Sequence, residues 1–156
     1  MESKTGRADL TQLFSELVRL ETELWDAVES RVRAEHGLAL GSYEVMTVVA
    51  QRPGCRVHDI AAALSITVGG VSKIVDRIEA TGDCMRRANP GDRRSSIIEL
   101  SPAGQRRLAD VTGTVERELS RRLAPALQDR SPSEFTLQLI QLRAAVRASD
   151  PGQEAS

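Results

Sequence analysis

The stretch VHDIAAALSITVGGVSKIVDRIEATG, residues 57–82, contains two short helical patterns separated by a tight turn. The first is a two-turn segment over 57–64. The second carries four apolar residues on one helical face: Val71, Ile74, Val75 and Ile78. Two short helices joined by a turn of three or four residues form a helix-turn-helix, which this spacing predicts. We expect a small core shared by the two helices and the turn, made of Ile60, Ala61, Leu64, Ile66, Val71 and Ile74.

The outward face of the second helix suggests contact with DNA. Its residues are small or hydrogen-bonding at the N-terminal end and basic further on: Thr67, Gly69, Gly70, Ser72, Lys73, Asp76 and Arg77. A recognition helix enters the major groove by its N-terminal end, where bulky side chains would hold the backbone away from the bases. Two other interpretations stay open, namely a frayed first turn at Gly69 and Gly70, and ordinary solvated charge at Lys73 and Arg77.

After Gly82 the hydrophobic period changes from 3.6 to 2, which predicts a β-hairpin. The segments CMRRA (84–88) and SSIIEL (95–100) flank the turn-forming stretch NPGDRR. A helix-turn-helix followed by such a hairpin is a winged helix, here over residues 42–101. The candidate DNA-binding residues of the wing are Arg86, Arg87, Asp92, Arg93 and Arg94. An arginine at the tip of a wing suits a narrow minor groove, where the negative potential is deepest.

Charge and composition agree with this interpretation. The formal net charge of the 156-residue chain is only −1, yet residues 84–108 carry six arginines against Asp92 and Glu99. We expect one compact chain without a membrane span or a signal segment, located in the cytoplasm. The two cysteines, Cys55 and Cys84, lie in no metal-binding or disulfide pattern and are interpreted as small buried residues.

Both ends of the chain are predicted to be helical. Apolar residues recur at helical spacing from Leu10 to Val32, and again in two stripes after Pro102. We expect long helices over 8–36 and 102–148 that assemble with a second copy, although an ordinary bundle within one chain stays open. Between them, SYEVMTVVAQRPG predicts a helix that begins with Ser42 as its cap and has Glu44 in its first turn.

The segments IAAALSITVGGVSKIVDRIEATG and RRANPGDRRSSIIELSPAGQRRL resemble the MarR family of bacterial transcription regulators over about residues 56–108. The resemblance implies a mainly α fold with a small β-hairpin wing, and a homodimer whose terminal helices intertwine. It implies that each winged helix binds one half of a palindromic operator in double-stranded DNA. It further implies that Arg94 enters the minor groove and that Asp92 orients the wing through a salt bridge. Gly69 and Gly70 depart from the usual Ser/Thr pair, so fewer side chains are left for base readout.

The resemblance also implies a small aromatic or phenolic effector, bound in a cleft between the helical region and the winged helix. Four residues are candidates for such a pocket: Trp25, His36, Tyr43 and Met46. Each has a simpler structural interpretation as well. Trp25 and Tyr43 fit core or dimer contacts, and His36 fits a cation at a helix C-terminus. The sequence names no effector.

Other function classes find less support in the sequence. Because His36 and His58 lie in different elements and no GxSxG, P-loop or HExxH motif is present, we do not expect an enzyme or a cofactor site. One alternative is a winged helix that binds an acidic protein partner. Another is a redox- or metal-responsive regulator that uses Cys84 or Cys55, although no compact set of metal ligands is visible. The expected function is a homodimeric repressor or activator that binds DNA.

Overall fold

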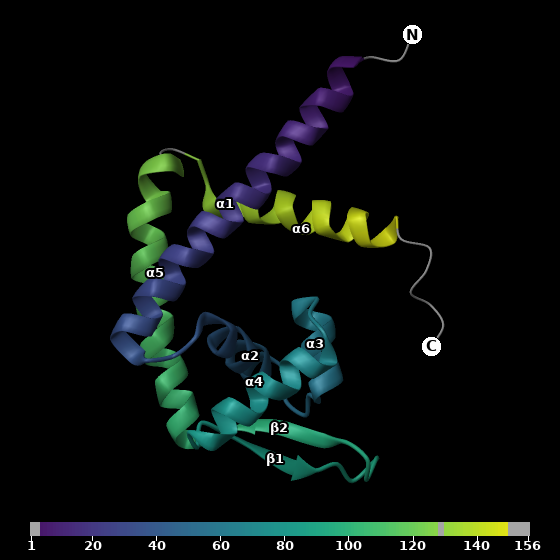
Figure 1. The fold of residues 1–156 in the computed structure, drawn as a ribbon, viewed down its shortest axis with the longest axis vertical. Coiled ribbons are helices and arrows are strands. Elements are labelled where there is room, and N and C mark those ends of the chain that lie inside the picture. The colour runs from purple at the N-terminus through teal and green to yellow at the C-terminus, as the bar shows by residue number, and fades with distance from the viewer. Residues whose placement is uncertain (1–3, 128–129, 150–156) are drawn as a thin grey trace. The chain divides into compact units, whose positions relative to one another are not determined.

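The fold is given by a computed structural model that describes residues 4–127 and 130–149 (Figure 1). In chain order its elements are α1 (Lys4–His36), α2 (Leu40–Gln51), α3 (Val57–Leu64), α4 (Val68–Ala80), β1 (Cys84–Ala88), β2 (Ser96–Leu100), α5 (Pro102–Leu127) and α6 (Pro132–Ala148). The expected mainly helical fold with one hairpin is therefore confirmed. Residues 128 and 129, inside the expected C-terminal helical region, lie outside the described residues. The chain divides after Leu119 into two compact units.

The first unit contains the winged helix, in which α2, α3 and α4 pack around a common core beside the hairpin (Figure 1). Its most deeply buried side chains come from α2, α3, α4 and β2: Val45, Met46, Ile60, Val71, Val75, Ile78 and Ile98. Burial of this apolar surface is the main source of stability for the arrangement. The helix-turn-helix therefore rests on one hydrophobic core, as its apolar spacing predicted.

The wing is an antiparallel hairpin in which β1 pairs with β2, from Cys84 opposite Leu100 to Ala88 opposite Ser96. The backbone N–H of Ile98 donates to the carbonyl oxygen of Cys55 at 2.9 Å, which ties β2 to the segment before α3. Ile98 itself is almost fully buried. The base of the hairpin is thus fixed to the helical core, while its loop extends beyond the helices (Figure 1).

The start of α2 differs from the expectation. The helix begins at Leu40 with Ala39 as its N-terminal cap residue, so the prediction that Ser42 caps it is wrong. Instead, the Glu29 carboxylate of α1 accepts a hydrogen bond from the backbone N–H of Leu40. A side chain from a neighbouring helix thereby satisfies a donor that a local cap would otherwise satisfy. As a consequence Ser42 is buried inside the helix, and Glu44 lies in its second turn rather than its first.

The turn between α3 and α4 also differs in one respect. Ser65 adopts a left-handed backbone with φ of 56°, and Thr67 caps α4 by accepting a hydrogen bond from the N–H of Gly70 at 3.1 Å. Ile66 leaves this turn with 43% of its surface exposed, so its expected place in the shared core is wrong. The left-handed residue reverses the chain direction and brings Ile66 to the surface.

Two polar contacts connect the winged helix to α1 and α5. Arg107 of α5 donates to the carboxylate of Asp83 at 2.6 Å and to the backbone carbonyl of His36 at 3.0 Å. Close by, a Cβ atom placed on Gly104 would lie 1.9 Å from the carbonyl oxygen of Asp83. The glycine of the LSPAG segment therefore permits α5 to begin directly against the backbone that leads into β1.

Candidate nucleic-acid interface

The outward face of α4 carries the residues that the sequence singled out. Lys73 and Arg77 are exposed, one helical turn apart, and neither makes an ion pair with any residue that the structure describes. Ser72 is half-buried beside them. Two unpaired cations on one helical face are free to contact phosphates or base edges together.

The two glycines at the start of α4 have different structural settings. A Cβ atom on Gly69 would meet no atom within 4 Å, whereas one on Gly70 would lie 3.1 Å from the Thr67 hydroxyl. Gly70 thus serves the capping hydrogen bond of its own helix. Gly69 serves no contact inside the described chain, and it leaves the backbone bare toward solvent. The capped first turn favours a formed helix over the frayed alternative.

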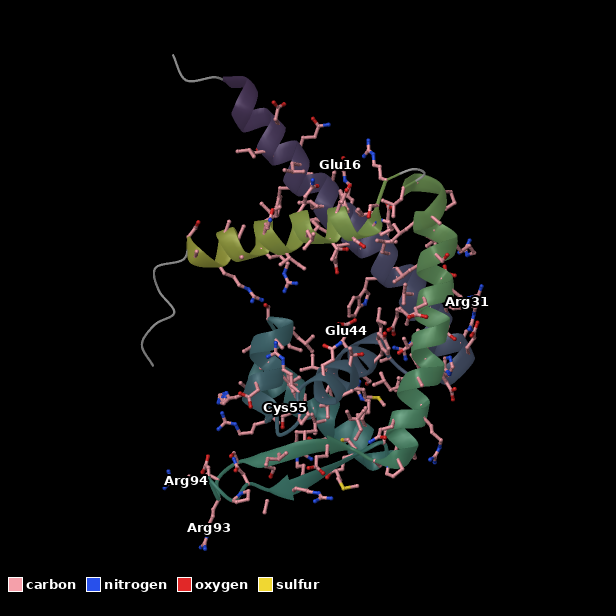
Figure 2. The ribbon with its side chains drawn as sticks, turned by 180° about the vertical axis from the view of Figure 1, so that it is seen from behind. Glu16, Arg31, Glu44, Cys55, Arg93 and Arg94 are labelled. Atoms are coloured by element: carbon pink, nitrogen blue, oxygen red, sulfur yellow. The ribbon has the colours of Figure 1, made fainter. Side chains whose placement is uncertain are left out.

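The tip of the wing presents Arg93 and Arg94, whose side chains extend away from the hairpin (Figure 2). The Asp92 carboxylate accepts a hydrogen bond from the backbone N–H of Arg94 at 2.9 Å, and this bond holds the pKa of Asp92 below its usual value. Among the described residues Asp92 makes no ion pair, so the expected salt bridge is wrong. Because a short Asp side chain readily bonds the backbone two residues on, it shapes the turn and leaves the Arg94 guanidinium unengaged.

The two strand arginines are engaged within the chain. Arg86 is half-buried and forms ion pairs with Asp76, at 2.6 Å, and with Glu79 of α4. Arg87 lies exposed and pairs with Glu99 of the opposite strand at 2.8 Å. Arg86 therefore fastens the hairpin to α4, while Arg87 offers a weaker, solvent-screened contact.

Sequence reasoning missed two residues beside the wing. Arg56 and His58, at the start of α3, are both exposed, and the Arg56 guanidinium forms an ion pair with Asp59 at 3.1 Å. They line a hollow of about 350 Å³ together with Val57, Val68, Ser72, Arg86, Asp92, Arg94, Ser95 and Ser96. In the sequence Arg56 and His58 flank Val57, which could have drawn attention to them. Their position near the wing follows only from the fold. Arg56 and Arg86 are paired with acidic residues, so among the described residues of this hollow Arg94 is the arginine without an ion pair.

Residues 38–96 match the model of the MarR family. Over these residues, which include α2, α3, α4 and β1, the chain resembles MarR-family regulators. Among curated proteins, the putative transcriptional regulatory protein for the hcr operon of Thauera aromatica is 29% identical over 87 residues, which is 56% of this chain and 52% of that protein. The chain spans about half the length of the first curated relatives it matches. These relatives are named as regulators of transcription, in agreement with the expectation that the chain is not an enzyme.

Solved structures of MarR regulators share the fold. The structure of BldR from Sulfolobus solfataricus has a TM-score of 0.77 at 17% identity, with 93% of this chain and 99% of that chain covered. The repressor CouR, bound to a 23-mer DNA duplex, has a TM-score of 0.74 at 26% identity, with coverage of 92% and 99%. A second structure holds CouR from Rhodococcus jostii RHA1 bound to p-coumaroyl-CoA, with a TM-score of 0.72 at 22% identity and coverage of 92% and 95%.

The chain also has a cavity of about 240 Å³ at the junction of α1, α2 and α5. Its lining consists of Glu21, Leu24, Trp25, Val28, Leu40, Glu44, Val115 and Leu119. Of the four candidate effector residues only Trp25 lines it. His36 instead contacts the Thr114 hydroxyl at 2.8 Å, Met46 is fully buried in the core, and Tyr43 packs against that core. Sequence reasoning placed Glu44 at a helix start and so missed it as a cavity residue.

Both cysteines of this chain are buried, as expected (Cys55 in Figure 2). Burial raises the pKa of the Cys55 thiol, and it raises the pKa of Cys84 to about 11. Because the thiolate is the reactive form, neither site favours a thiol switch. Within 4–127 and 130–149, no group of three or more His, Cys, Asp or Glu side chains is arranged to hold a metal ion.

In the described ranges, 4–127 and 130–149, no single helix is both long and apolar enough to cross a bilayer. Only α3 and α4 taken together reach the required length and apolar content, with a bend of 114° between them. These two helices form the helix-turn-helix.

Proposed function

We propose that this chain is a DNA-binding transcription regulator that acts as a homodimer on a pseudo-palindromic operator. In this proposal α4 enters the major groove and the wing reaches the adjacent minor groove. The observation that carries it is Gly69 in the first turn of α4, where the backbone is open to solvent, with unpaired Lys73 and Arg77 further along the helix and the outward Arg93 and Arg94 of the wing. The CouR–DNA complex, at 26% identity, supports the same use of the fold.

The contacts are expected to divide into base readout and backbone contacts. Gly69 allows the α4 backbone to approach the bases, and Lys73 and Arg77 reach base edges or phosphates. Ile66, in the turn before α4, and Val68, the first residue of α4, are both exposed and suit contact with thymine methyl groups. Arg94 is proposed to enter the minor groove, with Arg93 on a phosphate next to it. Arg56 and His58 line the same hollow as Arg94 and lie at this surface.

Dimerisation is proposed from apolar surface that the described chain leaves uncovered. On α1, Leu10 and Phe14 are 67% and 68% exposed, next to exposed Leu13 and Val18. In the second unit, α6 has no buried residue. Its exposed apolar side chains include Phe135, Leu137, Ile140, Leu142 and Val146. Contiguous exposed apolar surface of this kind usually marks an interface. A second copy of the chain would cover both faces. Both faces lie within the expected dimerisation region, residues 8–36 and 102–148.

Control by a small molecule is proposed at the cavity between α1, α2 and α5. This cavity joins the helix that carries the exposed apolar face to the helix that begins the winged helix. A bound effector would therefore alter the position of one relative to the other. CouR, with the same fold, has been solved with p-coumaroyl-CoA bound.

Selection of bound sequences from random duplex DNA tests the proposal. We expect enrichment of a pseudo-palindrome whose half-sites are centred about 10 bp apart, because dimeric helix-turn-helix proteins meet successive major grooves on one side of the duplex. Recovery of no common sequence, together with salt-independent binding, would contradict DNA recognition. Binding to an acidic protein surface in place of DNA would favour the protein-interaction alternative.

A further inference from the structure

We infer that the cavity between α1, α2 and α5 binds a hydrophobic cation, such as an arylalkylammonium ion or a quaternary ammonium compound. The inference rests on the proposed function, since it takes this cavity as the effector site, and it adds the chemical class of the effector. It differs from the phenolic class that the family resemblance suggests.

The composition of the cavity wall carries the inference. Six of its eight lining side chains are apolar, and the other two are the carboxylates Glu21 and Glu44. None of the eight is basic. A carboxylate or phenolate ligand would therefore meet apolar surface and like charge. A cation with an apolar body matches both parts of this wall.

Glu44 is the decisive lining residue (Figure 2). Its side chain is half-buried on α2, and its carboxylate makes no hydrogen bond or ion pair with any residue that the structure describes. Burial raises its pKa above the usual value, and burial is the sole cause of this shift. A carboxylate placed in apolar surroundings without a partner is costly, and a bound cation removes that cost.

Trp25 provides a second recognition element. It is 41% exposed in the cavity wall, so part of its indole ring is open to a ligand. A smaller adjoining hollow is lined by Glu21, Thr22, Trp25 and Asp26, which places further carboxylates around the same side chain. The face of an indole ring attracts cations, and neighbouring carboxylates strengthen that preference over neutral and anionic ligands.

The test compares three probes of similar size on the wild-type protein: phenyltrimethylammonium, its neutral isostere tert-butylbenzene, and benzoate. Trp25 is the single tryptophan of the chain, so its fluorescence reports directly on occupancy of this cavity. We expect the cation to bind at least about tenfold more tightly than the isostere, because charge-assisted and cation–π contacts add to equal apolar burial. Equal affinity for the three probes, a preference for benzoate, or no binding of the cation would overturn the inference.

Two matched variants locate the charge responsible. Glu44→Gln keeps the size of the side chain and is expected to remove most of the preference for the cation over the isostere. Glu23→Gln removes the same charge from an exposed position on α1 that does not line the cavity, and is expected to leave the preference unchanged. Circular dichroism verifies folding, and the wild-type comparison stands by itself if a variant does not fold. An unchanged preference in Glu44→Gln would overturn the inference.

DNA binding by the free protein separates this inference from the proposed function. A protein that binds its selected DNA yet shows no preference for the cation contradicts the inference alone. A protein that prefers the cation yet binds no DNA supports the inference and contradicts the proposed function.

Discussion

Gly69 and Gly70 are neighbours in the sequence, yet the structure separates their roles. Gly70 accommodates the hydroxyl of Thr67, which caps α4, while Gly69 faces open space. Glycine inside a helix costs about 1 kcal/mol relative to alanine, so its presence at Gly69 calls for a reason outside the helix itself. Close approach of the α4 backbone to the bases of DNA is such a reason.

Gly69→Ala should therefore raise stability and lower DNA affinity at the same time. We expect a gain of about 0.5–1 kcal/mol in the free energy of unfolding, from helix propensity. Operator affinity should fall, by roughly tenfold if the new methyl group holds the backbone away from a base. Chemical denaturation and fluorescence anisotropy measure the two effects. Gly113→Ala, in α5, is the matched control and should gain stability with no change in DNA affinity.

Glu44 makes stability depend on pH in a direction that can be worked out. Its pKa is raised by burial, so the folded protein binds its proton more tightly than the unfolded chain does. The stability contributed by this proton is present below the unfolded pKa and is lost as pH rises through the folded pKa. Glu44→Gln should accordingly raise Tm by roughly 2 °C near pH 8 and change it little near pH 4. An equal effect at both pH values would contradict the uncompensated burial of this carboxylate.

Local patterns predicted individual residues only where local interactions decide their environment. The buried cysteines and the exposed wing arginines follow from nearby sequence. The Ser42 cap failed because Glu29, from another helix, supplies the acceptor at the start of α2. The Asp92 salt bridge failed because a backbone N–H two residues away competes successfully for the carboxylate.

Among the elements, the attachment of the hairpin to α4 determines where the wing points. Arg86 of β1 joins two acidic residues of α4, Asp76 and Glu79, across the space between the two elements. This contact is half-buried, so it is less screened than a surface ion pair. The spacing between the recognition helix and the wing depends on it.

Arg86→Ala should therefore weaken DNA binding through geometry rather than through a lost phosphate contact. We expect operator affinity to fall while the salt dependence of binding, the slope of log K against log salt, stays unchanged. The protein should also lose about 1 kcal/mol of stability. Arg87→Ala is the matched control, since it removes the same charge from the adjacent strand position, where the ion pair is exposed. A shallower salt slope in Arg86→Ala would show that Arg86 contacts DNA itself.

The boundaries of α3, α4 and the hairpin were predictable because each of these elements shows its own period. The 3.6-residue repeat defines α3 and α4, and the change to a period of 2 after Gly82 defines the hairpin. The cavity was not predictable, because its wall combines residues from α1, α2 and α5 that have no sequence relation to one another. Trp25 was a candidate effector residue because of its aromatic side chain. Glu44 could not be recognised as a cavity residue until the start of α2 at Leu40 was known.

For the complete chain, the charge distribution connects fold and function. Residues 1–50 carry nine acidic and five basic residues, whereas the segment that includes the wing is basic. The net charge of the chain is near zero because these two segments carry opposite charge. In the proposed arrangement, the acidic N-terminal part of the chain faces a second copy and the basic wing faces DNA. Electrostatic attraction to the phosphate backbone is then local to the winged helix.

The salt dependence of binding by Arg94→Ala tests this account of DNA recognition with a single number. Fluorescence anisotropy on the selected operator, at several salt concentrations, gives the slope of log K against log salt for the variant and the wild type. Removal of one phosphate-proximal cation per wing should reduce the slope by about 1 for each wing, or about 2 per dimer, together with a loss of affinity. An unchanged slope and affinity would remove the wing tip from the interface and contradict the proposed mode of binding.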